Sequence, residues 1–195
     1  MSISPSSSRS CGASSRPIAG DSGMTLGRLL AADARYSFAL RIPAAARWRR
    51  RLAATLAHSG DSWFWLLGLA WVWVSGIPAA RSWALAVAAT IGLLAVTVLA
   101  LKRLVRRARP EGEWGQIYRA TDPHSFPSGH AARAFLLAVL VTGWGPNWLA
   151  PILWMWAPLV GLARVALGVH FLSDIVAGAA LGLLGGLLAV LAFPG

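Results

Sequence analysis

Acidic side chains and cysteine are both scarce in this sequence of 195 residues. Only seven residues are Asp or Glu, against 18 Lys and Arg, so the formal net charge is +11. The single cysteine, Cys11, lies in a Ser-rich stretch, which excludes an intramolecular disulfide framework. Residues 1–24 also lack an apolar core of the length that a signal peptide needs, so we expect a disordered tail there.

Charged residues of either sign are few. They make up 13% of the chain, whereas 56% of the residues are hydrophobic, a balance that excludes an ordinary soluble domain and indicates a membrane protein. A basic face that binds nucleic acid needs water around it, so we expect no nucleic-acid partner. The excess of cations is better suited to anionic lipid head groups and phosphorylated substrates.

Residues 25–57 form an Arg-rich segment that is too charged to cross a bilayer. Its leucines are spread among seven arginines. We expect a pair of amphipathic helices at the membrane interface, interrupted near Pro43, with the arginine stems reaching toward head groups.

Long uncharged runs fill most of the rest of the chain, from residue 58 to residue 195. Each run is bounded by Gly, Pro or charged residues and approaches the length needed to cross a bilayer. The sequence therefore predicts an all-α, polytopic membrane helix bundle with about five spans, multi-pass in the cell membrane. The expected spans cover residues 62–77, 82–101, 129–144, 148–163 and 174–193.

The first polar cluster follows the second expected span. Lys102 and Arg109 are seven positions apart, so on a continued helix both would face the same way and could grip one phosphate. The alternative is a basic collar at the end of a span. We expect Arg103 and Arg107 to serve only as such a collar.

The second cluster opens the third expected span. Ser128 is a candidate N-cap, and Gly129 lets a ligand approach the backbone closely. A helix N-terminus offers free N–H groups to a phosphate oxyanion, and His130 would lie in the first turn within reach of it. The alternative is an ordinary helix start with a solvated histidine.

The third cluster surrounds the start of the fifth expected span. His170 and Asp174 are four residues apart, so on a helix the carboxylate could orient the imidazole and leave its other nitrogen free to attack. Arg164 is costly near a bilayer without an anionic partner, which a phosphate would supply. The alternative is a structural Asp–His pair. We expect neither a catalytic metal nor a cofactor, because no carboxylate-rich or closely spaced histidine cage is present.

Three motifs occur in a fixed order, separated by apolar runs: K-x6-RP, PSGH and R-x5-H-x3-D. Over residues 58–195 this pattern resembles the type 2 phosphatidic acid phosphatase family, whose site is shared with vanadium haloperoxidases. The resemblance implies a metal-independent phosphatase in which His170 attacks phosphorus to give a phosphohistidine, Asp174 holds that histidine, and His130 protonates the leaving oxygen. It also implies five residues that hold the phosphoryl oxygens: Lys102, Arg109, Ser128, Gly129 and Arg164.

One position departs from the family pattern. Members often have Ser before the third-cluster arginine, whereas this chain has Ala163, so one phosphate contact is missing or replaced. Two other interpretations stay open at this point. One is a membrane protein that binds lipid phosphate without hydrolysing it, and the other is a haloperoxidase-like enzyme that holds vanadate in the same pocket.

Counting spans places all three clusters on one side of the membrane, together with the N-terminal segment. The opposite side carries Arg81 and almost no other charge, so the positive-inside rule predicts a cytoplasmic active site. The expected partner is a lipid phosphate: a prenyl or polyprenyl phosphate or diphosphate, a phosphatidate-type lipid, or a polyprenyl-linked sugar phosphate. Nothing in the sequence indicates an oligomeric state.

Overall fold

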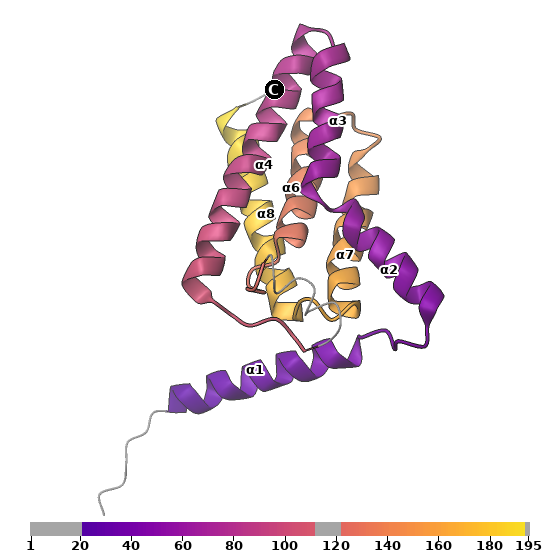
Figure 1. Ribbon diagram of the computed structural model, residues 1–195. Helices are drawn as coiled ribbons and strands as arrows, with labels where there is room; N and C mark the ends of the chain where they lie inside the picture. The colour runs from indigo at the N-terminus through magenta and orange to yellow at the C-terminus, as the bar shows by residue number, and fades with distance from the viewer. Residues whose placement is uncertain (1–20, 112–121, 194–195) are drawn as a thin grey trace, which may run out of the picture.

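The computed structural model describes residues 21–111 and 122–193. This part of the chain holds seven α-helices and no β-strand (Figure 1). The helices are α1 (Asp21–Ala39), α2 (Arg47–Ser59), α3 (Ser62–Ser75), α4 (Pro78–Val105), α6 (Gly129–Trp144), α7 (Ala150–Ala166) and α8 (Leu172–Ala192). The all-helical fold class is therefore confirmed.

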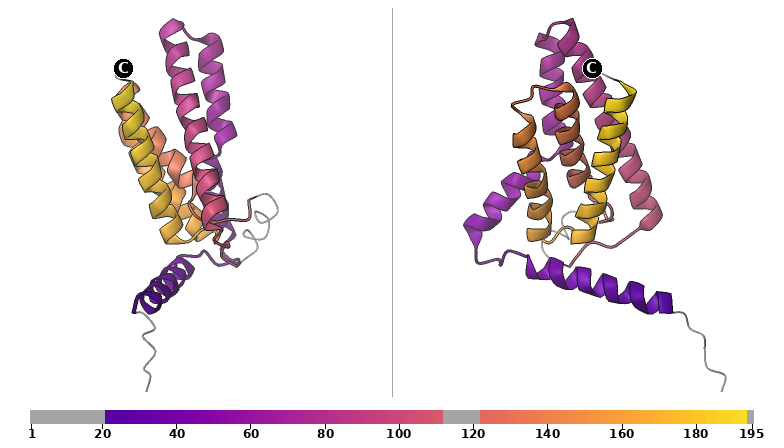
Figure 2. Two further views of the ribbon diagram at one scale, coloured as in Figure 1. Left: turned by 90° about the vertical axis from the view of Figure 1, so that its left-hand side faces the viewer. Right: turned by 180° about the vertical axis from the view of Figure 1, so that it is seen from behind.

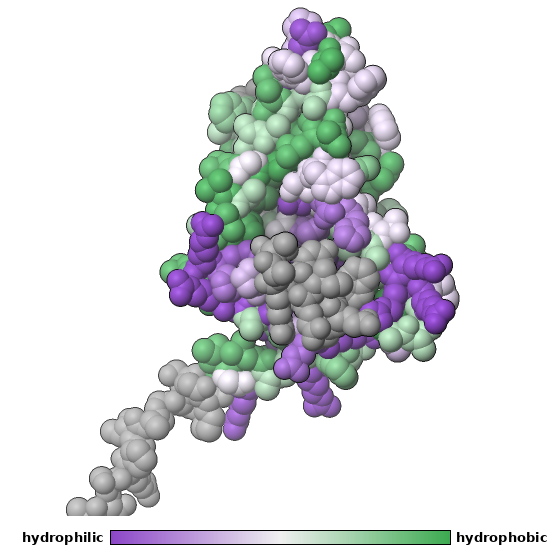
Figure 3. Space-filling view, in the orientation of Figure 1, coloured by the Kyte–Doolittle hydropathy of each residue, from purple (hydrophilic) through white to green (hydrophobic). Residues whose placement is uncertain are grey.

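Five of these helices, α3, α4, α6, α7 and α8, coincide with the five expected spans. By length and composition, α4 with 28 residues and α8 with 21 residues are long enough to cross a membrane. The other three are apolar but shorter, with 14, 16 and 17 residues. Hydrophobic residues gather over the upper part of the bundle, whereas hydrophilic ones gather at its lower end (Figure 3).

Helices α6 and α8 pack so closely that glycine is required between them. A Cβ at Gly182 would lie 2.0 Å from the carbonyl oxygen of Ala132, and one at Gly178 would lie 2.4 Å from that of Ser128. Small residues that let two helix backbones approach are typical of membrane bundles. At the same end, the backbone N–H of Ser128 donates to the carbonyl oxygen of Asp174 at 3.0 Å. The start of α6 and the start of α8 are thereby held together.

The N-terminal helices lie outside the five-helix bundle. Helix α1 runs across its lower end, and α2 leads up from there to α3 (Figures 1 and 2). The predicted interruption near Pro43 is confirmed, since α1 ends at Ala39 and α2 begins at Arg47. Helix α1 begins at Asp21, a few residues before the predicted end of the tail at residue 24. The rest of the predicted tail, including Cys11, lies outside the described residues.

Candidate active site

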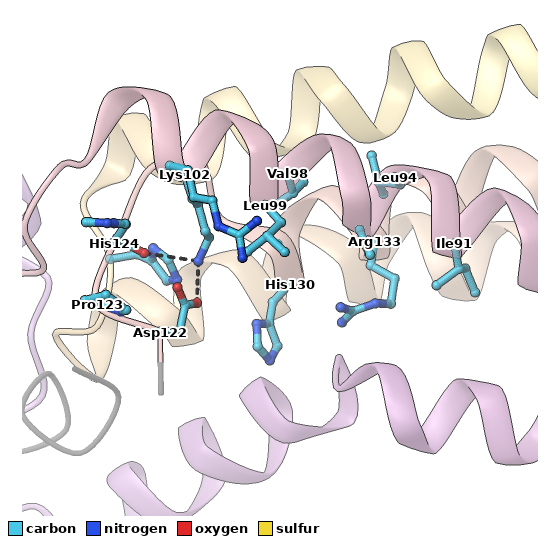
Figure 4. A pocket seen from close by; sticks show the side chains of 14 residues that line it. Ile91, Leu94, Val98, Leu99, Lys102, Asp122, Pro123, His124, His130 and Arg133 are labelled. Carbon is cyan, nitrogen blue, oxygen red and sulfur yellow. Dashed lines mark hydrogen bonds and ion pairs between the residues drawn. The ribbon is translucent and has the colours of Figure 1, made fainter. Parts of the chain in front are cut away.

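A cavity of about 450 Å³ opens at the polar end of the bundle, beside α4 and the start of α6 (Figure 4). All three sequence clusters reach it, since Lys102, His130 and His170 line its wall. One side is apolar and comes from α4. The lining residues of that side are Ile91, Leu94, Ala95, Val98 and Leu99.

His170 lies in the connection between α7 and α8, and only 1% of it is exposed. Its Nε2 is 3.3 Å from Nη1 of Arg109, and its Nδ1 is 3.4 Å from Oδ2 of Asp174. The second approach is too poorly aligned to be a hydrogen bond. The expectation that His170 and Asp174 share a helix is wrong, because α8 begins only at Leu172.

The surroundings of His170 favour the neutral form of its imidazole. Burial lowers the pKa of His170 well below its ordinary value, and the positive charges of Arg164, Arg109 and Lys102 lower it further. A neutral imidazole has a free lone pair, which a nucleophile requires. The nitrogen that faces the cations, Nε2, is the one placed to attack.

Asp174 is held by donors other than His170. Its Oδ2 accepts a hydrogen bond from the backbone N–H of Phe171 at 2.8 Å, and its Oδ1 accepts one from Nη1 of Arg107 at 2.8 Å. The guanidinium of Arg107 also lies 4.0 Å from the ring centre of Phe171. The interpretation of Arg107 as a mere collar residue is therefore wrong, because this arginine orients the carboxylate beside His170.

Helix α1 joins the same network. Nη2 of Arg107 donates to Oδ2 of Asp33 at 2.7 Å, and the backbone N–H of Ser173 donates to Oδ1 of Asp33 at 3.0 Å. The hydroxyl of Ser37 accepts from the N–H of Leu172 at 2.9 Å, so α1 caps the start of α8 from outside. Burial raises the pKa of Asp33, but hydrogen bonds from Ser173 and Arg107 outweigh it, and the net pKa lies below the ordinary value.

Lys102 and Arg109 both point to the site, although not along one helix. The expected continuous helix is wrong, because α4 ends at Val105 and Arg106 adopts a left-handed conformation with φ of 52°. The chain then turns. Arg109 does not line the cavity itself but lies behind its wall, in contact with two residues that do, His170 and Asp122.

The anionic partner of these two buried cations is Asp122. Its carboxylate pairs with Nζ of Lys102 and lies 2.7 Å from Nη2 of Arg109. Only 5% of Lys102 and 3% of Arg109 are exposed, and cations so deeply buried require a compensating charge. A phosphate that entered the cavity would compete with this carboxylate for the same donors.

Arg164 is a third buried cation near the two histidines, although it does not line the cavity. It lies in the last turn of α7 and is 1% exposed. Its charge acts on both His130 and His170, so it lies close to the two imidazoles. Ala163, which stands where the family pattern often has Ser, is a buried part of the apolar packing between α2 and α7.

The start of α6 is built as the sequence predicts. Ser128 is the N-cap, and its hydroxyl accepts from the N–H of Ala131 at 3.4 Å. Gly129 lines the cavity, and a Cβ added there would touch only Val98, at an ordinary distance of 3.5 Å. The surrounding protein therefore leaves room for a side chain at Gly129, and the space is open to a ligand.

His130 has a carboxylate partner that sequence reasoning missed. Its Nε2 lies 2.6 Å from Oδ1 of Asp61, the residue before α3, whose Oδ2 lies 3.1 Å from Nδ1 of His58. Burial raises the pKa of Asp61, but the hydrogen bonds from His130 and His58 lower it more, so the net pKa falls below its ordinary value. The sequence did contain one signal for this contact. Because the chain has only seven acidic residues, an Asp placed directly before an apolar run is a candidate partner for a site histidine.

Comparison with known proteins agrees with this geometry. A family model described as the PAP2 superfamily matches residues 81–195. The chain belongs to this superfamily. A PAP2 relative, the decaprenylphosphoryl-5-phosphoribose phosphatase of Mycobacterium tuberculosis, is 36% identical over 132 residues, which are 67% of this chain and 72% of the relative. The family resemblance is thus confirmed, and the chain is a PAP2-type phosphatase.

Two solved structures share the fold. The transmembrane PAP2 phosphatidylglycerolphosphate phosphatase of Bacillus subtilis superposes with a TM-score of 0.70 at 26% identity, covering 86% of this chain and 87% of that one. LpxE of Aquifex aeolicus superposes with a TM-score of 0.63 at 24% identity, covering 82% and 93%. The helical fold of this chain is therefore that of a transmembrane PAP2 phosphatase.

Proposed function

We propose that this PAP2 protein hydrolyses a lipid phosphate through a phosphohistidine on His170, without a metal ion. The observation that carries the proposal is the setting of His170. Its buried imidazole presents Nε2 to Arg109 in a cavity that His130 and Lys102 also line. This arrangement offers a nucleophile, cations and a proton donor around one volume.

The reaction proceeds in two steps. In the first, Nε2 of His170 attacks phosphorus, the bond to the lipid alcohol oxygen breaks, and His130 gives that oxygen a proton. In the second, His130 takes a proton from water, the water oxygen attacks phosphorus, and the N–P bond breaks to release phosphate. Asp61 holds Nε2 of His130, and Asp174 lies beside Nδ1 of His170, so each imidazole has a carboxylate partner.

Cationic side chains take the role that a metal would otherwise fill. Negative charge builds on the equatorial oxygens of the phosphoryl group in the transition state, and fixed donors stabilise it there. Lys102, Arg109 and Arg164 supply three such charges. Within residues 21–111 and 122–193, no group of three or more His, Cys, Asp or Glu side chains could hold a metal ion.

The cavity suits a lipid. Its apolar side extends along α4 from Leu99 to Ile91, about 12 Å at 1.5 Å per residue, and leads away from the polar end. An isoprenoid or acyl chain can lie along that side while the phosphate enters the cationic end. Of the substrate classes left open by the sequence, we favour a polyprenyl-linked sugar phosphate. Its support is the similarity to a phosphatase named for decaprenylphosphoryl-5-phosphoribose.

A phosphate-release panel tests this function. Purified protein in detergent is supplied with a polyprenyl-linked ribose phosphate, farnesyl phosphate, farnesyl diphosphate and phosphatidate, each with and without EDTA. We expect phosphate release from at least one lipid, most from the ribose-linked one, and no loss with EDTA. Binding without release would favour the non-catalytic interpretation, and loss of activity with EDTA would overturn the metal-free mechanism.

We also propose that the active site faces the cytoplasm and that α1 and α2 lie on that membrane surface against anionic lipids. Seven arginines flank this end of the bundle, whereas Arg81 lies at the start of α4, near its other end. The exposed leucines of α1, Leu26 at 59% and Leu29 at 63%, would enter the lipid boundary.

Thiol labelling in intact cells checks this orientation. In a Cys11→Ser background, Glu111→Cys marks the active-site end and Arg81→Cys marks the opposite end. Both positions are exposed. We expect a membrane-impermeant thiol reagent to label the Arg81→Cys protein and to reach the Glu111→Cys protein only after cell lysis. The reverse pattern would place the site on the outer face.

A further inference from the structure

Arg133 is a cavity residue that the proposed two-step reaction does not use. It lies three residues after His130 on α6, so the two side chains share a helix face and are about 4.5 Å apart along the axis. Figure 4 shows both side chains extending from α6 to the same side, with Ile91 of α4 lying farther along in the direction of Arg133. Arg133 thus lies between the reacting end of the cavity and its apolar end.

The hydrogen bonds of Arg133 leave part of its guanidinium unused. Nη1 donates to the carbonyl oxygen of Gly60. Nε is buried and has no hydrogen-bond partner among the described residues. The nearby carboxylate of Asp61 acts on Arg133 electrostatically, but its two oxygens are engaged by His130 and His58. An arginine that is half-buried in a membrane bundle and has an unmet donor is costly unless a ligand completes it.

The position of Arg133 relative to the reaction defines what that ligand would be. The reacting phosphate is held by Lys102, Arg109 and Arg164, and the leaving oxygen faces His130. The leaving group of the substrate must therefore extend past His130 toward Arg133, and its lipid chain then reaches Leu94 and Ile91. An anionic group on the leaving side, a few bonds beyond the ester oxygen, would meet the guanidinium there.

We propose that Arg133 binds a second phosphate, the phosphodiester that links a sugar 5-phosphate to its polyprenyl chain. This inference rests on the proposed function and assigns a second anion site to the same cavity. The spacing of one helical turn fits a sugar between the two phosphates. The site would make the enzyme prefer a lipid with two phosphates over one with only the reacting phosphate.

Two matched substrates test the proposal. One is farnesylphosphoryl-ribose 5-phosphate, and the other is farnesyl riboside 5-phosphate, which has the same sugar and chain but lacks the linking phosphate. We expect wild-type kcat/KM to be about 10- to 100-fold higher for the first, the range of a charge-assisted hydrogen bond. Equal values for the two substrates would overturn the proposal before any variant is made.

The variants separate binding from structure. Arg133→Gln keeps an amide donor for Gly60 but removes the charge, and Arg133→Lys keeps the charge. We expect Arg133→Gln to lose most of the preference for the diester substrate while changing kcat/KM for the riboside by less than about threefold, and Arg133→Lys to restore much of it. An equal loss on both substrates would show a structural role and overturn the proposal. If the wild type released phosphate from no lipid, the proposed function itself would fail.

Discussion

Replacing His170 with alanine is expected to lower phosphate release by at least about 10³-fold while the protein stays folded. The imidazole presents Nε2 to Arg109 and has the carboxylate of Asp174 beside its other nitrogen. Without it, no phosphohistidine forms, and water would have to attack the ester directly. Initial rates on the preferred lipid, together with thermal unfolding of both proteins, measure the effect.

The control for this change is His124→Ala. His124 lines the same cavity. Lys102 donates a hydrogen bond to the backbone oxygen of His124 and not to its imidazole. We expect less than about tenfold loss for this variant. A His170→Ala protein that released phosphate at the wild-type rate would exclude His170 as the nucleophile. Rapid quenching of wild type with ³²P-labelled substrate should, in addition, show an acid-labile protein-bound phosphate that His170→Ala lacks.

Replacing Arg109 with glutamine is expected to lower kcat/KM by about 10²- to 10³-fold. Its guanidinium is 3% exposed and contacts both Nε2 of His170 and the carboxylate of Asp122, so it lies where a phosphoryl oxygen would be held. The loss is expected mainly in kcat, because the charge on the phosphoryl oxygens is greatest in the transition state.

Arg106→Gln is the matched control, since it removes the same charge three residues earlier in the chain. Arg106 is exposed, and its Nε donates only to the carbonyl oxygen of Arg103. We expect its kcat/KM to change by less than about twofold. If both variants lost activity equally, the effect would reflect the overall positive field and not a phosphate contact by Arg109.

Local patterns in the sequence were enough to predict the helices. Uncharged runs marked α3, α4, α6, α7 and α8, and Ser128 marked the start of α6, because span length and N-capping depend on neighbouring residues. The helices assumed for the Lys102–Arg109 cluster and for the His170–Asp174 cluster were wrong because of the backbone conformation at each place. Arg106 takes a left-handed conformation that only glycine commonly favours, and His170 precedes its helix.

The partners of the site residues could not be predicted because they come from far along the chain. Arg107 and Asp174 are 67 residues apart, and His130 and Asp61 are 69 apart. No spacing rule connects such positions, and only the packing of whole helices brings them together. The scarcity of acidic residues limited the candidates, but it could not show which carboxylate meets which cation or imidazole.

The hydrogen bonds of Asp33 also show that segments before the family match contact the site residues. The family match begins at residue 81, yet Asp33, Ser37 and Asp61 lie before it. A protein trimmed to the matched region would leave His130 without its acid partner and the first turn of α8 without its outer cap. The contacts that hold the site residues in place therefore extend back to α1.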